Sequence, residues 1–240
     1  MELLKNEITS VISKIEDVTA DFNPYPHFYI ENCFLNTEEI FEKEPDNKIF
    51  EFGRINKFLT FHDVPVDYDK LYNYFMDLSE CLFKKFKIDK KVESVRPSLE
   101  YWIDNEDFDI TDIHTDYLIL KDGKKMGDDY ELISGQVYLP DENDDIKLGT
   151  RIHEYIGEDI EKDTVYSDEL ISVKNHLNLK NNNNVIEKFP VIKEIPFKRG
   201  VMFFHHTVPN SWHSAPKIPK GYIRKSMMLR LLIKIKKDMI

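Results

Sequence analysis

From residue 92 onward, the chain alternates short apolar segments with polar turns. The clearest of these segments are Ser98–Ile103, Tyr117–Leu120, Gln136–Leu139, Val201–Phe204 and Met227–Ile235. Strands at such spacing, with turn residues between them, are typical of a sandwich or barrel. The chain has 240 residues, of which 41% are hydrophobic, so one sizeable core can form around these strands. We therefore expect a single, mainly β domain with flanking helices.

The flanking helices are predicted from apolar periodicity. Residues 67–86 carry one apolar stripe at steps of four, three, four and four, formed by Leu71, Phe75, Leu78, Leu82 and Phe86. Such a stripe indicates a helix that packs on a sheet. Residues 1–22 also carry apolar residues at helical spacing, which predicts an N-terminal helical arm, either docked or frayed. The domain itself is expected over residues 23–240.

A polar stretch from Glu154 to Asn184 interrupts the strand pattern and ends in four consecutive asparagines. It predicts a surface insertion at about residues 154–195. Loops of this length are usually functional lids or flexible segments, and both alternatives stay open here.

Charge and cysteine content restrict the partners and the location. The formal net charge of -11 repels nucleic-acid phosphates, so we do not expect a nucleic-acid partner. The two cysteines, Cys33 and Cys81, form no C-x-x-C pattern, which predicts free thiols in a reducing compartment. The chain shows no signal-peptide pattern and no apolar run long enough to span a membrane, so we expect a cytoplasmic protein.

His114-Thr115-Asp116 is the first stretch that suggests chemistry. On an extended strand, residues i and i+2 project to the same side, so the imidazole and the carboxylate can reach one ion. With 8 histidines and 44 acidic residues among 240, about 1.5 such triplets are expected by chance, and one occurs. The triplet alone therefore favours the simpler interpretation, a surface histidine near an aspartate in a polar turn.

Two later stretches give this triplet a context. His213 follows another apolar segment, and two histidines with one carboxylate are the ligands of non-haem Fe(II) oxygenases. Arg224 and Ser226 come shortly after it and share one face of a predicted strand. A guanidinium group binds a carboxylate through two parallel hydrogen bonds, so Arg224 and Ser226 predict an anion-binding group beside the metal.

Other residues compete for these roles. His205 and His206 directly follow the segment Val201–Phe204 and are alternatives to His213 as the third ligand. Arg230 is an alternative to Arg224, because the two lie on the same face of the predicted strand.

The ordered motifs resemble those of 2-oxoglutarate- and Fe(II)-dependent dioxygenases. The branch in question contains prolyl 4-hydroxylases and their small microbial or phage relatives. The resemblance rests on Ile113–Asp116, Gly200–Phe204, Trp212–Ser214 and Arg224–Ser226, with softer support from Pro26–Asn32. It covers roughly residues 24–235. It implies a double-stranded β-helix, or jelly roll, with helices packed on one outer face.

The resemblance also implies roles for individual residues. His114, Asp116 and His213 would bind Fe(II), and Trp212–Ser214 fits the family pattern better than His205 or His206 does. Arg224 and Ser226 would hold the distal carboxylate of 2-oxoglutarate. Two tyrosines are further candidates for hydroxyl contacts to 2-oxoglutarate, or are ordinary core aromatics: Tyr138 and Tyr101.

The implied reaction is hydroxylation of a substrate by dioxygen, with conversion of 2-oxoglutarate to succinate and CO2; ascorbate is a further candidate cofactor. Asp116 favours hydroxylation over halogenation, because halogenating relatives carry a small residue at this position. The substrate is a peptidyl side chain, an amino acid or a small metabolite. Two alternatives stay open: a non-catalytic jelly-roll binding module, and a cupin-type metal enzyme without 2-oxoglutarate.

Overall fold

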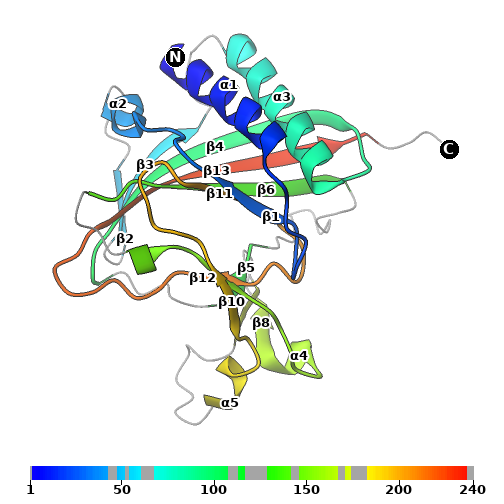
Figure 1. Ribbon diagram of the computed structural model, residues 1–240, viewed down its shortest axis with the longest axis vertical. Helices are drawn as coiled ribbons and strands as arrows, with labels where there is room; N and C mark the ends of the chain where they lie inside the picture. The colour runs from blue at the N-terminus through cyan, green and yellow to red at the C-terminus, as the bar shows by residue number, and fades with distance from the viewer. Residues whose placement is uncertain are drawn as a thin grey trace.

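Two antiparallel β-sheets face each other, and helices cover the outer face of the larger sheet (Figure 1). The structure is a computed structural model. It describes residues 2–42, 48–51, 54–60, 68–107, 113–116, 129–141, 146–166, 171–173 and 183–236. The expected strand Tyr117–Leu120 lies outside these residues.

The larger sheet has seven strands and the smaller sheet has six. In spatial order, the larger sheet consists of β1 (His27–Ile30), β11 (Met202–His206), β6 (Tyr130–Tyr138), β13 (Arg224–Ile235), β4 (Val92–Asp104), β3 (Arg54–Thr60) and β2 (Lys48–Glu51). The smaller sheet consists of β10 (Val191–Glu194), β7 (Arg151–His153), β12 (His213–Ser214), β5 (His114–Thr115), β9 (Ile171–Val173) and β8 (Thr164–Tyr166).

The chain passes back and forth between the two sheets. It runs from β4 in the larger sheet to β5 in the smaller, then to β6 and β7 in the same alternation. The pattern returns with β10, β11, β12 and β13. Two such strand sets wound together make a double-stranded β-helix, or jelly roll. This confirms the expected fold class.

Alternation along β13 divides its residues between two environments. One set is buried in the core beneath the helices: Met227, Leu229, Leu231 and Ile233. The intervening set faces the smaller sheet: Arg224, Ser226, Met228 and Arg230. The neighbouring strands β4 and β6 follow the same division, because they pair with β13 in continuous antiparallel register. The larger sheet therefore has an apolar outer face and a polar inner face.

Three helices cover the apolar face: α1 (Glu2–Asp17), α2 (Thr37–Glu42) and α3 (Tyr68–Phe86). The five residues of the stripe predicted for the third helix are all buried in the core of the larger sheet. Helix α1 lies beside α3 and buries four residues at helical spacing: Leu4, Ile8, Val11 and Ile15. Both expected helices are thus present, and the first one is docked.

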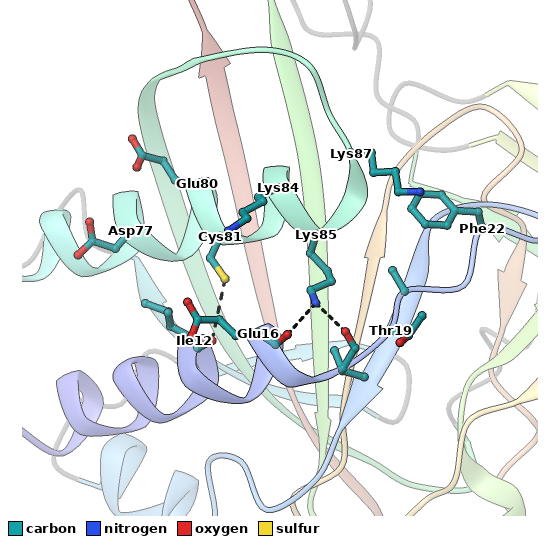
Figure 2. A pocket seen from close by; sticks show the side chains of 12 residues that line it. Ile12, Glu16, Thr19, Phe22, Asp77, Glu80, Cys81, Lys84, Lys85 and Lys87 are labelled. Carbon is teal, nitrogen blue, oxygen red and sulfur yellow. Dashed lines mark hydrogen bonds between the residues drawn. The ribbon is translucent and has the colours of Figure 1, made fainter.

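A groove runs between α1 and α3 (Figure 2). At its floor, the Nζ atom of Lys85 donates hydrogen bonds to the carbonyl oxygens of Glu16 and Val18, at 3.2 and 2.6 Å. These carbonyls lie at and just beyond the C-terminus of α1, where helix carbonyls lack intrahelical partners. Lys85 therefore fastens the end of α1 to α3. Cys81 also lines the groove, and both Cys81 and Cys33 are free thiols.

The described part of the expected insertion contains regular structure. It includes β8, β9, β10 and two single-turn helices, α4 (Ile160–Asp163) and α5 (Asn183–Ile186). Strand β9 pairs with β5, so the insertion extends the smaller sheet. A 3-10 turn, η1 (Ile146–Leu148), precedes β7. A lid function, and the division of the chain into residues 1–22 and 23–240, stay predictions.

No helix among the described residues is long and apolar enough to cross a membrane.

Replacement of Ile8 by alanine tests the docking of α1. Ile8 is fully buried against the core, so we expect Ile8→Ala to lower the free energy of unfolding by about 2–5 kcal/mol in urea denaturation. The matched control is Ser13→Ala, at an exposed position of the same helix, which should change stability little. Equal stability of the two variants would show that α1 is not part of the core.

Candidate metal and co-substrate site

Three side chains of the smaller sheet converge on its inner side. His114 on β5 and His213 on β12 are direct partners across the two adjacent strands, and their ring centroids are 4.4 Å apart. Asp116 follows β5, with its carboxylate oxygens 3.8 Å from Nε2 of His114 and 3.9 Å from Nε2 of His213. One ligand atom from each residue lies within 4.8 Å of the other two. The structure thus brings together the three residues predicted to bind metal.

Local hydrogen bonds orient His213. Its Nδ1 atom lies 2.9 Å from the carbonyl oxygen of Ser211, which can only accept, so Nδ1 carries the proton. The lone pair is then on Nε2, the atom that faces Asp116. Thr115 holds the turn before β12 in place, because its hydroxyl donates to the carbonyl of Val208 at 3.1 Å. The hydrogen bond to Ser211 therefore explains why His213 presents Nε2 to the other side chains of the cluster.

Burial sets the charges of the cluster. Burial, together with the nearby His114, lowers the pKa of His213 to about 4, so the imidazole is neutral at pH 7. Burial alone would raise the pKa of Asp116, but interactions with His213 and Arg230 outweigh it and hold that pKa well below its usual range. Neutral imidazole and ionised carboxylate are the forms that bind metals. The donor set of two imidazoles and one carboxylate fits Fe(II).

Opposite this cluster, the inner face of the larger sheet carries Arg224 and Ser226. Arg224 is only 2% exposed, and its Nη1 atom lies 3.9 Å from Oδ2 of Asp104. Ser226 is fully buried and pairs with Tyr138 on β6. Burial raises the pKa of Tyr138, and the positive charge of Arg224 partly counteracts this rise. Arg224, Ser226 and Tyr138 therefore share one buried region.

A chain of hydrogen bonds connects these groups. The hydroxyl of Tyr138 donates to Thr150 Oγ1 at 2.6 Å, and that atom donates to Gln136 Oε1 at 2.9 Å. The amide of Gln136 then donates to the hydroxyl of Ser226 at 3.3 Å. We did not predict Gln136 or Thr150 from the sequence. Gln136 could have been found, because it lies two residues before Tyr138 on the same strand and therefore on the same face.

The structure does not bring Tyr101 into this set. Its side chain stacks on Phe41, with ring centroids 5.6 Å apart, in the core between the larger sheet and the helices. Tyr101 pairs with Met227, whose side chain faces the helices, whereas its neighbour Trp102 pairs with Ser226. The sheet therefore separates Tyr101 from the anion-binding residues, and we leave it out of the proposed site.

The competing histidines and arginine occupy different surroundings. The Nε2 atom of His206 lies 2.8 Å from Glu131, and its ring stacks on Phe86 of α3, on the outer face. His205 is on the inner face, with its ring 4.9 Å from that of His213, but outside the three-residue cluster. Arg230 donates to Glu100 at 2.9 Å. The geometry thus favours His213 as the third ligand.

Comparisons with known proteins find similarity only among solved structures. No family model and no curated protein matches the sequence. The structure is similar to a prolyl-4-hydroxylase of Pseudomonas putida (9% identity, 94% of this chain and 99% of that chain, TM-score 0.46). It is also similar to the epimerase SnoN in complex with Fe3+, alpha ketoglutarate and nogalamycin RO (12% identity, 95% of this chain and 83% of that chain, TM-score 0.46).

A third similar structure is a prolyl hydroxylase from Trichoplax adhaerens, in complex with a peptide fragment of the hypoxia inducible factor oxygen degradation domain. The identity is 10%, with 97% of this chain and 92% of that chain covered and a TM-score of 0.43. At this level of similarity, the function has to be derived from the side chains of the site.

The buried histidines make stability depend on pH. Burial lowers the pKa of His27, His153, His205 and His213 below the value of about 6.5 in an unfolded chain. The unfolded state therefore binds more protons below pH 6.5, and the native state loses stability as the pH falls toward its own lower pKa values. In the metal-free protein, His213 alone should account for a loss of about 2 kcal/mol between pH 7.5 and pH 5.

Urea denaturation of the metal-free protein at these two pH values measures this loss. The carboxylates with lowered pKa values, such as Asp116, do not contribute in this range, because they lose stabilising charge only near and below pH 4. Equal free energies of unfolding at pH 7.5 and pH 5 would contradict the assignment of neutral buried histidines.

Proposed function

We propose that the protein is an Fe(II)- and 2-oxoglutarate-dependent oxygenase of the prolyl 4-hydroxylase-like branch, which hydroxylates its substrate. The observation that carries this proposal is the convergence of His114, Asp116 and His213 on the inner side of a jelly roll. Two histidines and one carboxylate bind Fe(II) on one side and leave three adjacent positions for other ligands. The bound iron and 2-oxoglutarate supply the oxidation by dioxygen, with succinate and CO2 as products.

The chain's own residues bind and orient these groups. His114, Asp116 and His213 provide the lone pairs for the metal in an environment that excludes water, because two of the three are nearly fully buried. Ser211 keeps the proton of His213 on Nδ1, so that Nε2 stays available. In this proposal, no protein group accepts or donates a proton in the reaction.

Arg224 and Ser226 are suited to the distal carboxylate of 2-oxoglutarate. A buried guanidinium next to a buried hydroxyl offers charge-assisted hydrogen bonds in a setting of low dielectric constant. The hydroxyl of Tyr138 lies in the same region, but it donates to Oγ1 of Thr150 and accepts from the backbone N–H of Thr150, so Tyr138 orders the surroundings of the anchor and does not donate to the carboxylate. Arg224 and Ser226 are on the inner face of the larger sheet, which supports a co-substrate bound between them and the metal ligands of the smaller sheet.

One observation favours a second candidate function. Arg224 lies near the carboxylate of Asp104, which partly offsets the charge available to an incoming anion. In a cupin-type metal enzyme without 2-oxoglutarate, Arg224 and Asp104 would form a structural pair and the metal site would act alone. The two functions therefore differ in one measurable property, the affinity for 2-oxoglutarate.

The first test is anaerobic addition of Fe(II) and 2-oxoglutarate to the purified protein. We expect the weak visible absorption band of metal-to-ligand charge transfer, because both groups would bind to the same centre. His213→Ala should abolish the band, since it removes one of the two imidazole ligands from the metal. Absence of the band in the unmodified protein, at concentrations where Fe(II) binding is saturated, would reject the 2-oxoglutarate-dependent function.

Replacement of Arg224 separates co-substrate binding from metal binding. Arg224→Gln should weaken 2-oxoglutarate binding by about 10- to 150-fold, because hydrogen bonds to charged groups contribute about 1.5–3 kcal/mol, while metal affinity is retained. Isothermal titration with Mn(II) and then 2-oxoglutarate measures both affinities. Lys225→Gln is the matched control, since Lys225 is the next residue of β13 and forms an ion pair with Asp141.

The outcomes distinguish the candidates. Binding of metal without 2-oxoglutarate in the unmodified protein would support the second candidate function. Unchanged 2-oxoglutarate affinity in Arg224→Gln would assign the anchor to another residue.

A further inference from the structure

Three buried polar side chains lack hydrogen-bond partners among the described residues. They are Ser134, His205 and Thr207, which are 1%, 3% and 1% exposed. The hydroxyls of Ser134 and Thr207 and both ring nitrogens of His205 are involved. Buried polar atoms are nearly always paired, because an unpaired one loses its hydration without compensation. Such a group of atoms indicates a place where a polar ligand binds.

Two of these residues, His205 and Ser134, belong to a row of residues that begins beside the metal ligand His213. His205 on β11 pairs with Ser134 on β6, and Ser134 pairs in turn with Arg230 on β13. His205, Ser134 and Arg230 thus form one row across three adjacent strands, on the inner face of the larger sheet. The ring of His205 lies 4.9 Å from that of His213, and the charge of Asp116 interacts with both His205 and Arg230.

Arg230 is held in a fixed orientation at the end of this row. Its Nη1 atom donates to Glu100 at 2.9 Å, and its guanidinium lies over the ring of Trp102, 5.7 Å from the centroid. The indole of Trp102 donates to the other oxygen of Glu100 at 3.0 Å, which fixes the carboxylate. In the described chain, Glu100 is the one hydrogen-bond partner of Arg230, so Nε and Nη2 remain available as donors.

We propose that His205, Ser134 and Arg230 form the substrate subsite, and that the substrate carries a carboxylate bound by Arg230. This inference rests on the proposed function. Glu100 offsets part of the charge of Arg230, but Nε and Nη2 of Arg230 still offer a bidentate pair of donors, and Ser134 and His205 supply neutral hydrogen-bonding groups next to the carboxylate. Trp102 and Glu100 are positioning residues for Arg230.

The row is separate from the residues assigned to 2-oxoglutarate. Arg230 is four residues beyond Ser226 on the same strand, which is roughly 13 Å along an extended chain. The side chain of Arg230 is 35% exposed, whereas that of Arg224 is 3% exposed. An enclosed arginine suits a co-substrate held beside the metal, and a partly exposed arginine suits a substrate that enters from solvent.

Acetate is the probe for this subsite, and acetamide is its uncharged counterpart. Both are titrated into the Mn(II)-loaded protein saturated with 2-oxoglutarate, and paramagnetic broadening of the methyl protons reports binding near the metal. We expect acetate to bind with millimolar affinity and acetamide at least tenfold more weakly. Arg230→Gln should reduce acetate affinity at least tenfold, while the variant still binds Mn(II) and 2-oxoglutarate.

Lys234→Gln is the matched control. Lys234 lies four residues further along the same face of β13, and its amino group is paired with Glu93, so the substitution should not change acetate binding. Equal acetate affinity in Arg230→Gln and the unmodified protein would overturn the subsite. The subsite would also be overturned if the unmodified protein bound no detectable acetate, or bound acetamide as tightly as acetate.

A failure of the proposed function gives a different result. The unmodified protein would then not bind Mn(II) or 2-oxoglutarate in the preceding titration. If only 2-oxoglutarate fails to bind, the acetate titration is run on the Mn(II)-loaded protein alone, and the comparison between Arg230→Gln and Lys234→Gln still decides the subsite.

Ser134→Ala provides a test that needs no ligand. Replacement of a serine that stabilises the fold lowers the stability of the protein. An unpaired hydroxyl that serves only to bind a ligand instead costs stability when the ligand is absent, so its removal does not lower stability. We expect the melting temperature of ligand-free Ser134→Ala to be unchanged or raised, and its acetate affinity to fall. A lowered melting temperature would show that Ser134 is a structural residue and would remove it from the subsite.

Discussion

The rest of the structure depends on strand β13, whose two faces contribute to two different environments. Its twelve residues pair with β4 on one side, with one register shift between Lys234 and Ile235, and for most of their length with β6 on the other. Because successive side chains point to opposite faces, one strand contributes both to the apolar core beneath the helices and to the polar inner face. A shift of register by a single residue would exchange these two sets. The fold and the candidate site therefore depend on the same hydrogen-bond ladder.

The sequence predicted those parts of the structure that depend on order and spacing along the chain. A mainly β fold followed from short strands after residue 92, the jelly roll from the family resemblance, and helix α3 from its apolar stripe. The order of His114, Asp116 and His213 suggested a metal site, the resemblance selected His213 among the histidines, and the structure places the three residues together. These features depend on local residue patterns or on the order of residues along the chain, so a single sequence is sufficient to show them.

The features that were missed depend on contacts between distant segments. The position of Tyr101 could not be assigned, because its face relative to Arg224 depends on how β4 and β13 pair. Thr150 lies outside the strands and reaches Tyr138 only through the tertiary fold. The row of His205, Ser134 and Arg230 combines residues from three strands, and a single sequence gives no indication that they are adjacent.

The two strands that carry the histidine ligands contain only two residues each, and a single residue pair connects them, His114 with His213. So short a ladder contributes little cooperativity of its own, which makes this part of the smaller sheet prone to local opening. An ion bound by both strands acts as a cross-link between segments almost a hundred residues apart in the chain. Its free energy of binding then becomes free energy of folding for this half of the jelly roll. The lifetime of the protein would then depend on metal availability as well, because the ion-free form would open these two central strands of the smaller sheet to proteases more often.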